Sequence, residues 1–176
     1  SRIAQTLTNR VADFLSIAAP DFSFEAAPRG LETLRQLGGQ EVLLVSGVLP
    51  QSLTRLRQLE DRRADFEKAG IQVVLMAANT GAFPDAERAM PGAPRLALAG
   101  ADVMGTYAMF ACPAADPCAR TTPPHVEWLI DRAGYIRARW VGVPVAGAER
   151  TAEIMAGAIA LQQEPPRPPA QQEHGH

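Results

Sequence analysis

The chain has 176 residues, of which 47% are hydrophobic and 20% charged, and its formal net charge is -2. This length suits one domain with a buried core, so neither a disulfide framework nor a structural metal is needed for folding. The small negative charge provides no basic surface for nucleic acid. No apolar run approaches the roughly 20 residues that cross a bilayer, so we expect no direct membrane insertion by this segment.

The first residues predict an amphipathic leader helix, within residues 1–18. Their apolar side chains recur at helical spacing, at Ile3, Leu7, Val11, Phe14 and Leu15. Pro20 ends this helix and favours an extended stretch over residues 21–24. Residues 31–37 predict a short helix that ends at Gly38-Gly39.

From residue 41 onward, strands and helices alternate. Glu41 to Ser46 and Ile71 to Met76 are short apolar runs, typical of strands buried in a parallel sheet. The helix between them opens at Pro50, a residue favoured in the first helical turn. Its apolar face comprises Leu53, Leu56, Leu59 and Phe66. Its charged residues predict a solvated face and are Arg55, Arg57, Glu60, Asp61, Arg62 and Arg63.

The second half of the domain predicts further elements in a regular order. They are a short helix at 84–90, a weaker strand at 95–98, a helical stripe at 103–110, a strand hairpin at 126–140 and a last helix at 148–162. Residues 163–176 are proline-rich and polar, which predicts a disordered tail. This order favours an α/β domain over residues 19–162, with a central mixed sheet flanked by helices.

Three local stretches resemble the redoxin, AhpC/TSA-like and TlpA-like branch of the thioredoxin-like superfamily. They are APDF at the start of the domain, LGGQEVLLV at the first core strand and WLIDRAGYIR at the hairpin. Their order implies a thioredoxin-like fold over residues 19–162. The segments PHVEWLIDRAGYIRARW and LPQSLTRLRQL are also similar to redoxin-type domains appended to bacterial membrane proteins of the copper-resistance D type.

This second resemblance implies a location and a partner. The domain would belong to a larger membrane protein and lie on the periplasmic side of the bacterial inner membrane. Its partner would be another protein or the membrane portion of its own parent chain, and copper is the candidate metal.

The position of the usual reactive thiol contains no cysteine. In this fold the thiol lies between the first core strand and the next helix, where the helix N-terminus lowers its pKa. Here that stretch is Leu49-Pro50-Gln51-Ser52, and alignment of Pro50 with a CPxC motif places Leu49 and Ser52 at the two cysteine positions. We interpret Ser52 as a helix cap, because no histidine lies nearby in sequence to activate it.

The peroxiredoxin cysteine pattern is absent as well, so we predict a vestigial site with no catalytic residue. His125 lies where peroxiredoxins carry an arginine, and Pro124 is the candidate for the cis-proline of the thioredoxin branch.

Both cysteines lie in an insert, Cys112-Pro-Ala-Ala-Asp-Pro-Cys118. Turn-forming residues between them allow the two to meet at disulfide distance, and our leading interpretation is a structural disulfide formed in an oxidising compartment. Free thiols, a displaced redox pair and a soft-metal site stay open as alternatives. The metal site would combine Cys112, Cys118 and His125 with Met104 or Met109, a donor set suited to Cu(I).

His174 and His176 form a short metal-binding pattern that is more typical of a solvated tail. We expect no resident cofactor. The one candidate metal is copper, at the site that Cys112, Cys118 and His125 would form.

Two functions fit these observations. The first is a redox-inactive thioredoxin-like accessory domain of a bacterial membrane-associated protein, with a role in copper handling as its extension. The alternative is a thiol-disulfide oxidoreductase that uses Cys112 and Cys118 as a displaced redox pair. Fold cannot choose between them, because function depends on the site.

Overall fold

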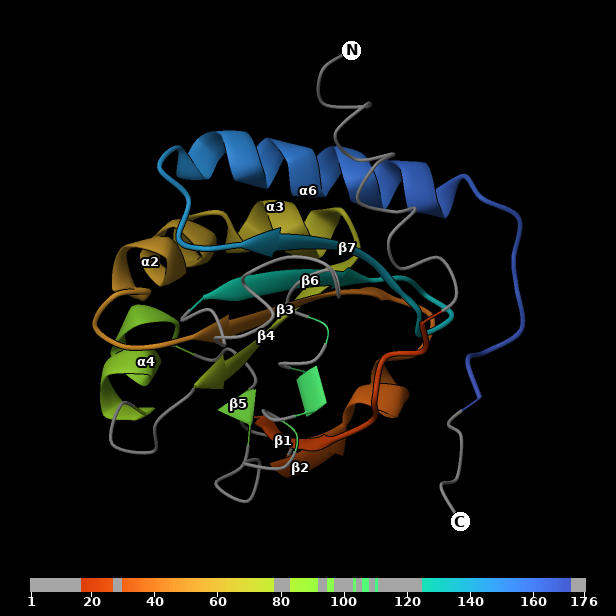
Figure 1. Ribbon diagram of the computed structural model, residues 1–176, viewed down its shortest axis with the longest axis horizontal. Helices are drawn as coiled ribbons and strands as arrows, with labels where there is room; N and C mark the ends of the chain where they lie inside the picture. The colour runs from red at the N-terminus through yellow and green to blue at the C-terminus, as the bar shows by residue number, and fades with distance from the viewer. Residues whose placement is uncertain are drawn as a thin grey trace.

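A seven-stranded mixed sheet runs through the part of the chain that the computed structural model describes, in the order β2-β1-β5-β4-β3-β6-β7 (Figure 1). The described residues are 17–26, 30–77, 83–91, 95–96, 103, 106–107, 110 and 125–171. The strands are β1 (Ser23–Ala26), β2 (Gly30–Thr33), β3 (Glu41–Gly47), β4 (Ile71–Ala77), β5 (Arg95–Leu96), β6 (Val126–Ile130) and β7 (Ile136–Val141). The helices are the 3-10 turn η1 (Leu34–Leu37), α2 (Leu53–Asp61), α3 (Arg63–Lys68), α4 (Phe83–Ala89) and α6 (Gly147–Gln162).

The centre of the sheet confirms the predicted topology. Strands β3 and β4 pair in parallel, and α2 and α3 form the connection between them. Strand β6 then pairs antiparallel with β3, with Val126 opposite Ser46, and β7 completes the predicted hairpin. This β3-α2-β4 unit, followed by an antiparallel hairpin and a final helix, is the arrangement that the resemblance to the thioredoxin fold implied.

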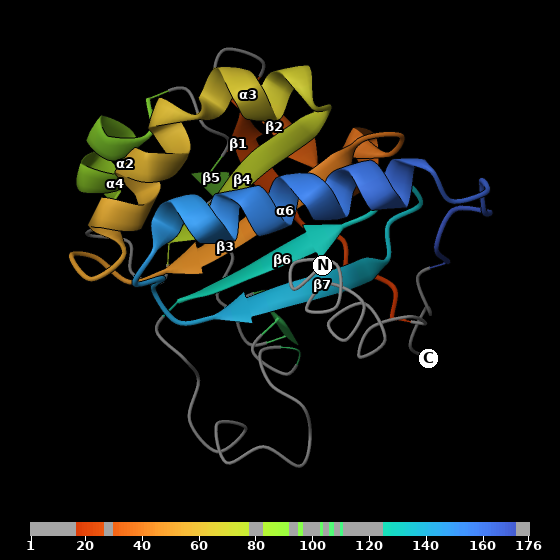
Figure 2. The same ribbon diagram turned by 90° about the horizontal axis from the view of Figure 1, so that it is seen from above.

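Each face of the sheet packs against its own core. Side chains alternate along a strand, so Leu43 and Val45 of β3 face one way, and Val42 and Leu44 face the other. Helices α2, α3 and α6 cover the first face (Figure 2). The second core is rich in aromatic residues contributed by the N-terminal strand region, Tyr107 and β6, and includes Phe22, Phe24, Tyr107 and Trp128.

The N-terminal region differs from two expectations. The helix predicted at 31–37 is instead strand β2 followed by η1, because residues 30–33 pair with β1 at the edge of the sheet. The leader helix lies outside the described residues up to position 16. Ile17 and Ala18, at its end, are extended: Ile136 donates its N–H to the Ile17 carbonyl, and Ala18 forms a bridge with Tyr135.

Residues 163–171, at the start of the predicted disordered tail, follow a defined path over the β6–β7 turn. Glu164 accepts two hydrogen bonds of 2.7 Å from the buried guanidinium of Arg137. Arg167 lies over the Tyr135 ring at 5.2 Å, and the Ala170 N–H donates to the Ala133 carbonyl. Arg137 also bonds to Asp131 at 3.0 Å, and Glu164 is its second carboxylate partner, which holds this polar segment in place. Residues 172–176, including His174 and His176, lie outside the described part.

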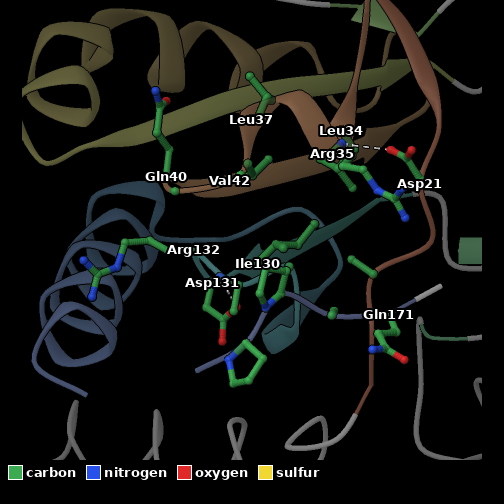
Figure 3. Close-up of a pocket in the computed structure, with 18 residues that line it drawn as sticks. Asp21, Leu34, Arg35, Leu37, Gln40, Val42, Ile130, Asp131, Arg132 and Gln171 are labelled. Carbon is green, nitrogen blue, oxygen red and sulfur yellow. Dashed lines mark hydrogen bonds between the residues drawn. The ribbon is translucent and has the colours of Figure 1, made fainter. Parts of the chain in front are cut away.

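A cavity of about 750 Å³ lies beside this tail, between the N-terminal segment, the start of β3 and the turn after β6 (Figure 3). Asp21 and Asp131 both lie at it, but their carboxylates are already bonded to backbone N–H groups. The cavity is at the opposite end of β3 from Ser52.

Within the described residues, no helix combines the length and the apolar character that a bilayer crossing requires.

Candidate functional site

The turn after β3 positions Ser52 at the start of α2. The Ser52 N–H donates to the Val48 carbonyl, and the Ser52 carbonyl accepts from the Leu56 N–H, so the residue occupies the N-cap position. Its side chain makes no capping hydrogen bond. The hydroxyl oxygen accepts the Val48 N–H at 3.1 Å instead, and no part of Ser52 is exposed. The interpretation of the Ser52 side chain as a helix cap is therefore wrong, because the hydroxyl has partners in the core.

His125 and Glu127 lie next to this hydroxyl. His125 directly precedes β6, and residues 125 and 127 lie on the same side of the strand because side chains alternate. Ser52 Oγ is 2.8 Å from His125 Nδ1, and His125 Nε2 is 2.7 Å from Glu127 Oε2. All three side chains have no exposed surface. His125 therefore lies against the start of α2, and its second ring nitrogen contacts a carboxylate.

Two arginines neutralise Glu127. Arg55, one turn into α2, donates to both carboxylate oxygens, with its Nη2 at 2.8 Å from Oε1 and its Nε at 3.1 Å from Oε2. Arg150 of α6 adds a bond of 3.1 Å to Oε2. The other branch of the Arg55 guanidinium donates to the Gly147 carbonyl and the Thr151 hydroxyl. Arg55 is fully buried, so its assignment to the solvated face of the helix is wrong.

The environment keeps Glu127 ionised. Burial opposes the charged form, but hydrogen bonds from His125 and Arg55, together with the positive charge of Arg55, outweigh it and lower the pKa of Glu127 to about 2. We call these side chains the Ser52 network: Ser52, Arg55, His125, Glu127 and Arg150. It links α2, β6 and α6 through the core.

We expect acid to weaken the fold through Glu127. Its pKa is lowered from 4.5 in the folded state, so its contribution to the free energy of unfolding is present above that value and is lost as pH falls toward about 2. The shift corresponds to a loss on the order of 3 kcal/mol. Urea unfolding measured over this pH range checks the loss.

The Glu164→Gln variant is the matched control, since Arg137 also lowers the pKa of this much more exposed carboxyl. The acid-dependent loss persists in Glu164→Gln and is strongly reduced in Glu127→Gln. An equal loss in wild type and Glu127→Gln contradicts this assignment.

The structure brings together only part of the predicted site. Leu49 packs against the core, Pro50 and Gln51 are exposed, and Ser52 contacts His125. Cys112, Cys118, Met104, Met109 and Pro124 lie outside the described residues.

Sequence reasoning missed Glu127 and Arg150, and it misassigned Arg55. One signal was available: Glu127 interrupts the apolar strand VEWLI, and a carboxylate within a buried strand requires a charged partner.

The geometry of His125 bears on the proposed copper site. Both ring nitrogens are engaged, one with Ser52 and the other with Glu127. Coordination of a metal requires a free nitrogen lone pair, so one of these two hydrogen bonds of His125 would have to break. Among the described residues, no group of three or more His, Cys, Asp or Glu side chains is placed to hold a metal ion.

Comparisons with known proteins identify the fold. No protein-family model matches the chain, and no curated protein matches it significantly. Solved structures do resemble it. A structure described as a thiol:disulfide interchange protein, DsbE, from Chlorobium tepidum has a TM-score of 0.63 and 19% identity, covering 81% of this chain and 96% of its own.

A structure described as a protein disulfide isomerase from Bacteroides thetaiotaomicron has a TM-score of 0.64 and 19% identity, covering 85% of this chain and 90% of its own. The mitochondrial 2-Cys peroxiredoxin from Plasmodium falciparum has a TM-score of 0.61 and 13% identity, with coverages of 84% and 95%. The chain therefore has the thioredoxin-like fold, and at these identities the likeness extends to the fold alone.

Proposed function

We propose that this chain is a thioredoxin-like accessory domain that lacks thiol chemistry at the usual position of the fold and acts by binding a protein partner. One observation carries the proposal. The two positions expected to hold cysteines contain Leu49 and Ser52, and the Ser52 hydroxyl is buried against His125. Thiol exchange requires an accessible thiolate, which neither residue supplies.

An apolar surface near this position supports a binding role. Val143 and Val145, in the connection between β7 and α6, are exposed, and Val145 is fully so. The Gly142 N–H donates to the His125 carbonyl at 2.8 Å, which fixes the start of this connection beside the Ser52 network. The connection and the β3–α2 turn lie at the same end of the sheet (Figure 1). Exposed valines at that end suit a partner that contributes apolar side chains.

The partner is a protein of the bacterial inner membrane on its periplasmic side, or the membrane portion of the parent chain. Support for this part comes from the sequence resemblance to appended redoxin-type domains. Copper binding by His125 with Cys112 and Cys118 has no support from the described geometry, because the ring nitrogens of His125 are both engaged.

We expect no appreciable insulin-disulfide reduction or thiol-dependent peroxide turnover by the purified chain. Both reactions need a thiolate at the helix N-terminus, where this chain has Leu49 and Ser52. A thioredoxin assayed in parallel provides the positive control. Turnover comparable to that of thioredoxin, abolished by Cys112→Ser or Cys118→Ser, contradicts the proposal and favours the alternative of a displaced redox pair.

A further inference from the structure

The polar atoms of Ser52, His125 and Glu127 are arranged in the order of a serine nucleophile, its base and the group that orients the base. Because Glu127 is ionised, it accepts the hydrogen on Nε2 of a neutral His125 ring. The lone pair on Nδ1 then faces the Ser52 hydroxyl at 2.8 Å. From this geometry we propose that Ser52 is a latent nucleophile that accepts an acyl group from small activated esters.

Two further contacts favour a negative charge on the Ser52 oxygen. The Val48 N–H donates to Oγ, which leaves the hydroxyl hydrogen for His125. Ser52 also lies at the N-terminus of the nine-residue helix α2, where the helix dipole stabilises developing negative charge. Arg55 keeps Glu127 ionised, and the carboxylate stabilises the imidazolium that forms when His125 takes the proton.

The reaction balances with an ester and water alone. The Ser52 oxygen attacks the ester carbonyl carbon while its proton passes to Nδ1 of His125. The tetrahedral intermediate expels the alcohol, which takes the proton from Nδ1, and an ester of Ser52 forms. Water, deprotonated by the same ring, then attacks this ester, releases the carboxylic acid and restores the Ser52 hydroxyl.

Burial of Ser52 determines how the reaction starts and which donors fit. The hydroxyl has no exposed surface, so the exposed segment at Pro50 and Gln51 has to move before a donor reaches it. Acylation then follows local opening, and its rate levels off as donor concentration rises. Space beside the hydroxyl is limited, since a Cβ on Gly47 would lie 2.7 Å from Ser52 Oγ. A small acyl group such as acetyl therefore suits the site.

The test uses the full chain and p-nitrophenyl acetate. In samples quenched with acid before the acyl group is hydrolysed, we expect one acetyl group on Ser52, located by peptide mass mapping, and release of p-nitrophenolate at a rate that saturates with ester. His125→Gln lowers the acylation rate by about 10²-fold or more, the typical contribution of a general base. Ser52→Ala abolishes acylation at this position. Ser46→Ala is the matched control, because Ser46 is a half-buried serine of β3 outside the network. We expect this variant to be acetylated on Ser52 at the wild-type rate.

A second measurement needs no variant. Nitrogen-15 chemical shifts of the His125 ring in the wild-type chain reveal which nitrogen carries the hydrogen, and the proposal requires Nε2. A ring protonated on Nδ1 alone overturns it. Acetylation confined to Lys68 and the N-terminal amine, or Ser52 acetylation that persists in His125→Gln, overturns it as well. None of these results alters the proposed absence of thiol chemistry, which the insulin assay tests separately.

Discussion

Replacing Glu127 with alanine lowers the free energy of unfolding by about 3–5 kcal/mol, the typical cost of breaking one partner out of a buried ion pair. The loss is large because Arg55 has no exposed surface and would stay buried without its carboxylate. Arg150, which is mostly buried, would lose the same partner. Urea unfolding at neutral pH, followed by circular dichroism, measures the difference.

The control is Glu60→Ala, which removes a carboxylate paired with Arg63 on the partly exposed surface of the helices. Such pairs contribute at most about 1 kcal/mol, so the two losses differ severalfold. Combining Glu127→Leu with Arg55→Met recovers part of the stability, because no unpaired charge from that pair remains in the core. A Glu127→Ala loss no larger than that of Glu60→Ala contradicts the assignment of Glu127 as the centre of the network.

Replacing Ser52 with cysteine produces a thiol with a pKa well below the ordinary value of about 8.5. Burial by itself raises a thiol pKa, but three features of the site act the other way. They are the His125 ring, the Val48 N–H and the N-terminus of α2. A thiolate paired with protonated His125 is the expected form near neutral pH, and its thiolate fraction there is about tenfold or more above that of an ordinary cysteine.

Thiolate absorbance in the ultraviolet, recorded against pH, measures this pKa without requiring reagent access. The background carries Cys112→Ala and Cys118→Ala so that one thiol remains. Thr54→Cys is the matched control, because Thr54 is exposed in the first turn of the same helix and shares the helix dipole without the His125 contact. If the thiol of Ser52→Cys titrates at or above the pH of the Thr54→Cys thiol, the network does not stabilise an anion at this position.

The fold could be predicted because its signals are local. The apolar runs from Glu41 to Ser46 and from Ile71 to Met76 are long enough for buried strands, and the turn between β6 and β7 is marked by Asp131 and Gly134. Strand β2 was missed because residues 30–33 gain their conformation by pairing with β1, a contact that helical spacing at 31–37 does not indicate.

The Ser52 network could not be predicted in the same way. Ser52 and His125 are 73 residues apart, and their contact depends on the antiparallel register that places Val126 opposite Ser46. Arg55 shares α2 with Arg57, which does face solvent, so charge alone could not distinguish the two arginines. Only the position of Glu127 inside a buried strand indicated that a buried cation was needed.

The described chain begins and ends at the same turn of the sheet. The Ala19 N–H donates to the Gly134 carbonyl, and the Ala170 N–H donates to the Ala133 carbonyl, so entry and exit lie on adjacent residues of the β6–β7 turn. Circular permutation therefore needs only a short linker between these ends, because they are already close. Insertion of the domain into a surface loop of another protein also requires that its two ends lie close together, and they do. In either arrangement the join lies at the far end of β3 from Ser52, so the connection between β7 and α6 lies at the end of the sheet away from the host (Figure 2).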